Sequence, residues 1–497
     1  MLSTVFEVGK PTFPPRSLTR PWISRSTRNA RQVERQLERE DEDPELRMPD
    51  KPSLVIIIMT NILSQTSNFI VVSSGPQYAA HLGGTNTFAG LIIGIPILTS
   101  GMALVPFVRY DRSLYKIPLL ISCVAAVVGN VLYGLAYRAN YLYLILIGRM
   151  VLGIAFTNFL YTKRFFSDRR VTGIRRRTTL ASWLVIGQSV GFTVGPFVGG
   201  LLYKIGFSNS VFNGFTSPGW IMATVWTLFG LATLFWFKEV PRQLPVEQAL
   251  PLQHMSLQPG TKEEQGAEQA GRSKSSIEIA GRSSHEQPHS SAQPELETPS
   301  YRPTRQQWAV IATMCWFAMT CFFVLGAWES FIPIYTARAF DSSPFAAGNL
   351  IALGGLCTFP FMLANIRFSR RVQDRQILAV GSGVGLAGLL MTIALFAADR
   401  MKFWSLFGCW FLVALGFNLA STVTLSLLSK QMPHHWNGRI SLIIQYSNFS
   451  GRVSGAVWGG AGVSVGLKSY VGLQLALIGI GGVMFLTLWR ELKAKKG

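Results

Sequence analysis

The segment Gly187-Gln-Ser-Val-Gly191-Phe-Thr-Val-Gly195-Pro196-Phe-Val-Gly199-Gly200 decides the fold class of this chain. It places a glycine at every fourth position over three helical turns of an apolar run, so these glycines share one helix face. In a bilayer such a face lets a neighbouring helix backbone approach closely. Pro196 removes one backbone donor, so we expect the helix to bend or loosen there. The segment therefore predicts a membrane helix packed along its glycines against a second helix.

The composition is that of a polytopic membrane protein. The chain has 497 residues, of which 49% are hydrophobic and only 14% charged, with a mean hydropathy of +0.30. A soluble domain would carry about 25% charged residues. The net charge of +21 could indicate nucleic-acid binding, but the basic residues cluster in short loops between apolar runs. We therefore predict a lipid bilayer, and no nucleic acid, as the partner of this charge.

Twelve apolar segments are long enough, at about 20 residues each, to span a bilayer. They lie near 53–78, 86–108, 117–137, 141–162, 179–203, 219–238, 307–335, 345–366, 377–397, 403–428, 440–464 and 470–489. We predict an all-α membrane protein built as two six-helix bundles. The predicted domains are a disordered cytosolic tail (1–52), an N-terminal bundle (53–238), a disordered cytosolic linker (239–305), a C-terminal bundle (306–490) and a cytosolic tail (491–497).

The basic residues of the short loops predict the orientation. With twelve crossings, the loops on the side of the termini hold 20 Lys and Arg residues, and the loops on the other side hold six. Basic loops stay in the cytosol, so both termini are expected there. Residues 1–31 are rich in Arg and Ser, as in a mitochondrial presequence. Their prolines would break the amphipathic helix that such a sequence needs, so we predict a cytosolic tail.

An internal repeat is visible in the glycines. The eleventh segment contains Gly451-Arg-Val-Ser-Gly455-Ala-Val-Trp-Gly459-Gly460, which has the same four-residue spacing as the fifth segment, six spans earlier. Two parallel repeats related by an axis along the membrane normal would produce this pattern. Small residues are also common on membrane helices by chance.

The fifth segment resembles the antiporter motif of the major facilitator superfamily, in particular that of its drug:proton antiporters of the fungal multidrug and metabolite efflux type. This resemblance implies two six-helix bundles and alternating access. A second, weaker similarity, through residues 161–168 and 175–179, is to a vacuolar and lysosomal branch of the superfamily. Basic inner loops of this kind are also ordinary topology determinants.

The loop after the second span resembles the superfamily motif G-x-L-x-D-R-x-G-R-K at Asp111, Arg112 and Lys116. In the family this loop is a gate latch, so the resemblance implies that Asp111 meets positive groups or a helix N-terminus across the bundle interface. Phe107 and Leu114 stand where the motif has glycine, and this leaves the local backbone of the latch open.

Glu329 is the only acidic residue well inside a predicted span. A charge in hydrocarbon costs about 2.5–3.5 kcal/mol on insertion scales, so it calls for a reason. Pro333 follows four residues later and deprives the Glu329 carbonyl of its helical donor, so the sequence allows a helix break there. Burial favours the protonated carboxyl, which suits proton binding and release. We therefore predict a coupling proton or a cationic substrate at Glu329. The alternative is an acid that pairs with Arg338 or is simply wetted.

Two arginines also lie inside spans. Arg149 stands in Gly148-Arg149-Met-Val-Leu-Gly153, which resembles the fourth-helix motif R-x-x-x-G that the family links to proton coupling. Only the arginine and Gly153 carry over. Arg149 could instead be a structural residue that binds carbonyls between helices. Arg452 could be the counter-ion of Glu329 or an anion contact.

A stripe of amides marks the first span. Asn61, Gln65 and Asn68 are spaced four and three apart, with Ser64 close by, so they share one helix face. Facing lipid they would be unsatisfied, so they are expected to point inward, either lining a cavity or forming hydrogen bonds between helices. The same two interpretations apply to Gln188, Asn418 and Thr422.

These observations predict a secondary transporter rather than an enzyme. The sequence has no phosphate-binding glycine loop and no helical zinc motif, and its five cysteines lack metal-ligand spacing. We expect no cofactor and no metal, with a proton gradient as the energy source. The resemblance implies export of a small organic molecule (a drug, toxin or secondary metabolite) by a monomer, in the plasma membrane rather than the vacuole. The alternatives are a vacuolar or lysosomal carrier of ions, phosphate or amino acids, and a non-transporting receptor or scaffold.

Overall fold

A computed structural model describes residues 47–110, 114–168, 170–240, 303–368, 372–433 and 436–493, and every regular element in these ranges is a helix. The helices are α2 (Lys51–Phe69), α3 (Gly75–His81), α4 (Asn86–Arg109), α5 (Lys116–Ala139), α6 (Leu142–Ala155), α7 (Asn158–Ser167), α8 (Ile174–Ile205), α9 (Ser217–Trp236), α10 (Arg305–Phe340), α11 (Pro344–Phe368), α12 (Asp374–Ala397), α13 (Phe403–Ser429), α14 (Asn437–Ala461) and α15 (Leu467–Thr487).

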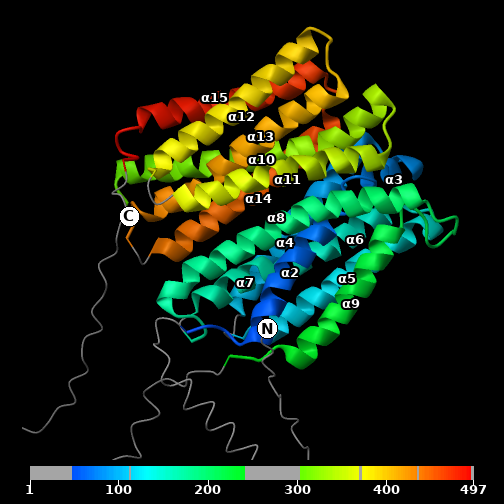
Figure 1. Ribbon diagram of the computed structural model, residues 1–497, viewed down its shortest axis with the longest axis horizontal. Coiled ribbons are helices and arrows are strands. Elements are labelled where there is room, and N and C mark those ends of the chain that lie inside the picture. Colours follow the sequence, from blue (N-terminus) through cyan, green and yellow to red (C-terminus); the bar gives the residue numbers. More distant parts are fainter. Residues whose placement is uncertain are drawn as a thin grey trace, which may run out of the picture.

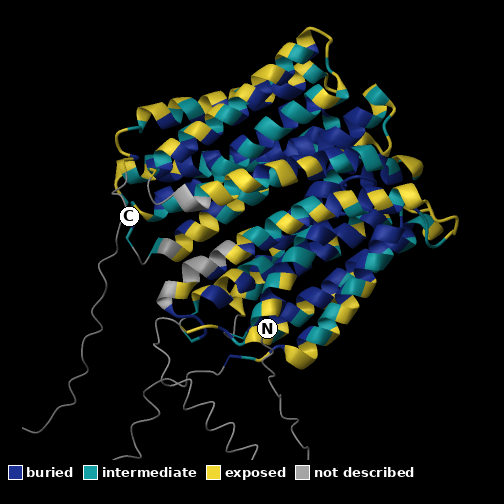
Figure 2. Cartoon of the chain, in the orientation of Figure 1, coloured by how far each residue is buried: buried dark blue, intermediate teal, exposed yellow. Residues whose placement is uncertain are grey.

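The helices form two sets that lie side by side (Figure 1). In the first set, α2 to α9, the closest packing is between α5 and α6, α2 and α8, and α5 and α9. In the second set, α10 packs on α14 and α12 on α13. Figure 2 shows buried residues between the helices and exposed residues along their outer faces. This all-helical architecture is the one predicted from the sequence.

Ten of the predicted spans are long and apolar enough to cross a membrane in the described ranges, with α6 and α7 counted together. The two remaining spans correspond to α2 with α3, and to α14. These are also the spans with the most polar sequence. α2 buries Asn61, Ser64, Ser67 and Asn68 inside the protein, and α14 carries Arg452. The low hydropathy of α2 therefore follows from an inward-facing polar side.

Two predicted spans are interrupted in the structure. The first span ends as α2 at Phe69 and resumes as α3 at Gly75, and the fourth span is divided between α6 and α7. Gly75-Pro76 is a turn signal that could have indicated the first interruption. In contrast, α8 runs through Pro196 and α10 runs through Pro333. The break that we considered after Glu329 is therefore absent, because a proline removes only one hydrogen bond and this part of α10 is buried on all sides.

The glycines of α8 contact two helices. A methyl group added at Gly191 or Gly195 would collide with backbone or Cβ atoms at the end of α2, and one at Gly199 would collide with Ile70 and Ser73, which follow α2. A methyl group at Gly200 would collide with the start of α11. Gly187 faces the same helix, where Ile62 would lie 3.2 Å from an added methyl carbon. The glycine face predicted from the sequence is thus the surface on which α8 packs against α2.

The glycines of α14 repeat this arrangement in the second set. Added methyl groups at Gly451, Gly455 and Gly459 would collide with the backbone of α10, and one at Gly460 would collide with Asn86 and Gly90 of α4. In each set, therefore, three glycines of one helix contact a segment of the same set, and a fourth glycine contacts a helix of the other set. The two halves use one packing pattern, as the spacing of the glycines predicted.

The ends of the described ranges lie together at one end of the protein. The Gly173 N–H donates to the carbonyl of Arg47 at 3.0 Å, and Lys238 pairs with Asp50 at 3.0 Å. Both the N and the C label lie toward this side in Figure 1. We call it the terminal end, and the opposite end, where α3 lies, the far end.

Glu239 was assigned to the linker, but it has a structural role at the terminal end. Its carboxylate accepts the backbone N–H groups of Tyr115 and Lys116 at 2.9 and 2.8 Å. These are free donors at the start of α5, and a carboxylate at a helix N-terminus is favourable. The end of the predicted linker is also ordered, because Thr304 caps α10, which begins at Arg305. Residues 241–302 of the linker lie outside the described residues, as do residues 1–46 of the predicted N-terminal tail and residues 494–497 of the C-terminal tail.

Candidate functional site

Glu329 and Arg452 form an ion pair in the interior of the second set. The Nη2 of Arg452, on α14, lies 2.5 Å from the Oε2 of Glu329, on α10. The Glu329 side chain is only 2% exposed and the Arg452 side chain 16%. The backbones of these two helices approach closely because Gly326 faces Arg452 and Gly455 faces Phe323. Arg452 is thus the partner of Glu329, whereas Arg338, the partner that we also considered, is exposed.

Arg452 also reaches the other set of helices. Its guanidinium carbon lies 5.1 Å from the ring centre of Phe69, at the end of α2, and 5.8 Å from that of Phe322. Phe69 in turn packs edge-on against Phe192 of α8, with ring centres 4.7 Å apart. A cation over an aromatic face is attracted to it, more strongly where water is excluded. The ion pair therefore touches the interface between the two sets.

Arg149 forms hydrogen bonds to the end of α2, just before the interruption of the first span. Its guanidinium donates to the carbonyls of Ser67 and Asn68, to the side-chain oxygen of Asn68 at 2.8 Å, and to the carbonyl of Ile92 on α4. The Asn68 carbonyl is available because the Val72 N–H bonds to Phe69 instead. Arg149 is 1% exposed. The geometry is that of the structural alternative, an arginine that satisfies carbonyls between helices.

Arg149→Lys is expected to destabilise the protein, because one ammonium group cannot reach all of these acceptors. Each buried carbonyl left without a donor costs about 1–3 kcal/mol. The denaturation midpoint of the purified protein in detergent measures the loss. Arg138→Lys, at an exposed arginine of α5, is the matched control. Equal denaturation midpoints for the two variants would show that the hydrogen bonds of Arg149 do not stabilise the fold.

The close approach of α6 to α4 explains the glycine that follows Arg149. A methyl group at Gly153 would collide with the Thr99 hydroxyl and the Pro96 carbonyl of α4. Gly153 therefore lets α6 lie close enough to α4 for Arg149 to bond to Ile92.

The amides of α2 form hydrogen bonds between helices. Gln188 of α8 donates to the Asn61 side chain at 3.2 Å, and Asn68 bonds to Arg149. Gln65 is half-buried, with its Cβ against Gly191. On α13, Asn418 and Thr422 bond to carbonyls of their own helix. For Asn61, Asn68 and Gln188 the structure thus shows the helix-to-helix alternative.

Of the predicted gate loop, only Lys116 is described, because Asp111 and Arg112 lie outside the described residues. The neighbouring Tyr115 donates its hydroxyl to Asp168 at 2.8 Å, and Arg170 pairs with the same carboxylate. Burial disfavours the charged form of Asp168, but the hydrogen bonds from Arg170 and Tyr115 outweigh burial and hold its pKa below the usual value. An acid that loses this network must bind a proton at a higher pH.

Both interior arginines meet the first span at its interruption. Arg149 bonds to Ser67 and Asn68 from within the first set, and Arg452 lies over Phe69 from the second. This convergence could not be predicted from the sequence, because the three segments are far apart along the chain. Only the turn signal at Gly75-Pro76 could have drawn attention to the place.

Sequence comparison agrees with this architecture. The sequence model of the Major Facilitator Superfamily matches residues 57–456. The chain belongs to this superfamily. It is a membrane transporter of the major facilitator kind. One relative is an uncharacterized MFS-type transporter of Schizosaccharomyces pombe, 30% identical over 459 residues, which cover 90% of this chain and 83% of the relative.

Solved structures share the major facilitator fold with this chain. A POT family transporter in complex with a thioalcohol-conjugated peptide superimposes with a TM-score of 0.63 at 12% identity, covering 88% of this chain and 96% of the other. A bacterial homologue of the human lysosomal transporter Spinster, inward-facing and unoccupied, gives 0.61 at 14% identity, with the same coverages. At these identities the likeness concerns the fold alone.

Proposed function

We propose that this major facilitator protein is a proton-coupled transporter that exports a small organic molecule by alternating access. The observation that carries the proposal is the buried pair of Glu329 and Arg452, which contacts Phe69 of the other set. Proton binding and movement between the two sets of helices would be coupled at this pair.

The chemistry of the pair supports proton coupling. An ionised Glu329 neutralises Arg452, and the charge-assisted hydrogen bond between them holds α14 to α10. Protonation of the carboxyl removes the negative charge and weakens this bond. Arg452 is then left as a cation among Phe69 and Phe322 with no acid beside it, which is unfavourable in a water-poor interior. The free energy of the arrangement in which Arg452 contacts Phe69 therefore depends on whether a proton is bound to Glu329.

The glycine contacts support alternating access. Gly200 and Pro196 of α8 meet the first turns of α11, and Gly90 and Gly94 of α4 meet the last turns of α14. These contacts between the sets lie toward the far end. Backbones that touch without intervening side chains can part and meet again with little repacking. Export, rather than uptake, rests on the resemblance of the α8 glycines to drug:proton antiporters, and a cytosolic terminal end rests on the count of basic residues.

A second candidate is a carrier of anions such as phosphate or an amino-acid carboxylate, in the vacuole or lysosome. One observation favours it. Asp374, at the first residue of α12, is paired with Lys430. Away from the helix ends, the described membrane helices hold two interior arginines, Arg149 and Arg452, and one buried acid, Glu329, so this region carries one excess positive charge. Buried charges are normally paired. An anionic substrate would balance this charge, and it would balance two charges once Glu329 is protonated.

Flux through the purified protein in liposomes tests the proposal. The probes are ethidium, as an aromatic organic cation, and inorganic phosphate, each with and without an imposed pH gradient. We expect the gradient to drive ethidium movement about tenfold above the rate without it, the effect of a differential of about 1.4 kcal/mol. Glu329→Gln should lose this difference, because an amide cannot bind and release the proton.

Asp341→Asn is the matched control, because Asp341 is an exposed acid in a left-handed conformation that asparagine also adopts. It should keep the response to the gradient. Gradient-driven movement of phosphate alone would support the second candidate. If neither probe is transported, the result favours the alternative that the protein is a receptor or scaffold. An unchanged pH response in Glu329→Gln would refute the role of Glu329.

A further inference from the structure

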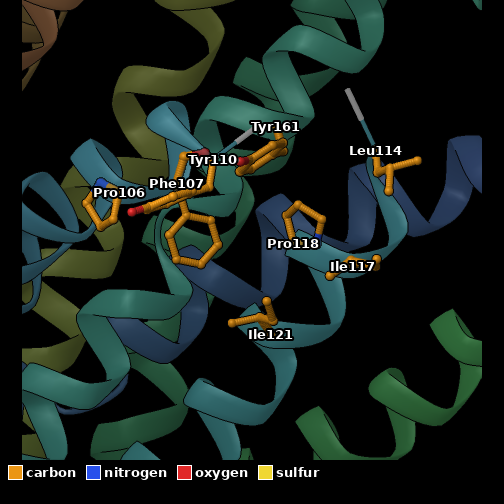
Figure 3. A pocket seen from close by; sticks show the side chains of 8 residues that line it. All are labelled: Pro106, Phe107, Tyr110, Leu114, Ile117, Pro118, Ile121 and Tyr161. Carbon is orange, nitrogen blue, oxygen red and sulfur yellow. Dashed lines mark hydrogen bonds between the residues drawn. The ribbon is translucent and has the colours of Figure 1, made fainter. Parts of the chain in front are cut away.

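An apolar pocket lies at the terminal end of the first set, away from the ion pair. It is lined from α4 by Pro106, Phe107 and Tyr110, from the start of α5 by Leu114, Ile117, Pro118 and Ile121, and from α7 by Tyr161. In Figure 3 the α4 side chains stand on one side, the α5 side chains on the other, and Tyr161 between them. The cavity volume of about 390 Å³ is within the range of ligand sites.

The pocket lining offers few hydrogen-bonding groups to a water molecule. The hydroxyl of Tyr161 already donates to the carbonyl of Phe107 at 3.3 Å. All eight lining residues are Pro, Phe, Leu, Ile or Tyr, and none of them carries a charge. A water molecule in a buried site needs two to four polar partners. An apolar occupant therefore suits this space better than water.

The pocket opens on the outer face of α5, which we expect the bilayer to cover. Ile117 and Ile121 are 54% and 43% exposed, and they continue along α5 as Val124 and Val128, at 63% and 43%. These residues follow one helix face at intervals of three and four. The two pocket residues thus belong to the lipid-facing stripe of α5. An acyl chain from the bilayer is the apolar molecule that lies against this opening.

Two basic residues lie among the lining residues in sequence, at the terminal ends of α4 and α5, although neither of them lines the pocket itself. Arg109 lies between the lining residues Phe107 and Tyr110 at the end of α4, and Lys116 lies between Leu114 and Ile117 at the start of α5. Arg109 is exposed and Lys116 half-exposed. Neither side chain has an acidic partner within the described part of the chain. Two cations beside an apolar slot at the membrane surface match an anionic headgroup attached to an acyl chain.

We propose that this pocket binds an anionic phospholipid, with one acyl chain between α4 and α5 and the headgroup phosphate at Arg109 and Lys116. In the orientation proposed above the site faces the cytoplasmic leaflet, where anionic lipids are concentrated. The bound lipid would contact α4, α5 and α7 together and so stabilise their packing. Because α4 also packs on α14, through Gly94 and Gly101, the lipid would favour the arrangement in which these two helices meet.

The test is lipid binding to the full chain purified in detergent, measured by mass spectrometry of the intact complex. Phosphatidylserine, phosphatidylcholine and glycerophosphoserine, which has no acyl chains, are each titrated. We expect phosphatidylserine to bind at least fivefold more tightly than phosphatidylcholine, and glycerophosphoserine not to be retained. Arg109→Gln should weaken phosphatidylserine about fivefold, the effect of one basic residue near an anionic lipid. Arg138→Gln, at an exposed arginine of the other end of α5, should leave it unchanged.

Filling the pocket provides the second arm. Ile121→Trp should abolish retention of phosphatidylserine, whereas Val124→Trp, the same change one turn along the lipid-facing stripe, should not. If Ile121→Trp does not fold, Ile117→Trp, at a more exposed lining residue, replaces it. Equal binding of the two phospholipids, binding of glycerophosphoserine as tight as that of the lipid, or normal retention by the tryptophan variants would each overturn the proposal.

Discussion

Arg452→Met is expected to destabilise the protein by about 3–5 kcal/mol, the cost of leaving one partner of a buried ion pair without the other. The Glu329 side chain is 2% exposed and is paired with Arg452. Methionine fills much of the same volume, so the loss comes from the carboxylate rather than from a cavity. The shift in the denaturation midpoint in detergent, with its slope, measures the change in the free energy of unfolding.

The double variant Glu329→Gln/Arg452→Met separates the pair from the packing around it. Removing the acid as well should recover most of the stability, because no charge is then left buried. Arg400→Met, at an exposed arginine, should stay within about 0.5 kcal/mol of the unchanged protein. Additive losses in the double variant would show that the two residues stabilise the fold independently, against the pairing described here.

Gly199→Ala is expected to prevent α8 from packing on the segment that directly follows α2. The new methyl group would coincide with the carbonyl oxygen of Ile70 and crowd the hydroxyl of Ser73. Inserting a methyl group into a packed site costs about 1–3 kcal/mol, and more where a backbone atom must move. We expect a loss above about 3 kcal/mol, seen as a lower denaturation midpoint and a smaller folded fraction on size-exclusion chromatography.

The internal repeat supplies a second test and a control. Gly459→Ala would drive a methyl group into the carbonyl of Ala327 on α10, so it should match Gly199→Ala in sign and size. Gly479 of α15 has no atom near its missing side chain. Gly479→Ala should therefore gain up to about 1 kcal/mol from helix propensity. If all three variants were equally stable, close backbone contact would not be the reason for the glycines of α8 and α14.

Much of the fold could be predicted from the sequence because membrane helices leave a strong local signal. Apolar runs of sufficient length, basic loops on one side, and glycines at four-residue spacing each act within one span or one loop. The position of Glu329 was also visible, since an acid in an apolar run stands out. Its pairing with Arg452 was one of the two roles considered for that arginine.

The interruptions of the first and fourth spans were not predicted, because their sequences stay apolar or small through the turn. The possible break at Pro333 is absent. A proline removes only one helical hydrogen bond, and packing against the surrounding helices keeps α10 continuous. Glu239 was missed for another reason. A single acid after an apolar helix has no pattern, and its partners at the start of α5 lie more than 120 residues away.

By itself the sequence determined that this chain spans a membrane, that it does so in two similar halves, and which glycines and which acid are exceptional. The tertiary structure alone decided which helix each glycine meets and that Arg149 and Arg452 converge on residues 67–69 from opposite sets. The physical reason is the distance along the chain over which each property acts. Hydropathy and helical period are properties of neighbouring residues, whereas the partner of a buried charge is selected by packing between segments that the sequence keeps far apart.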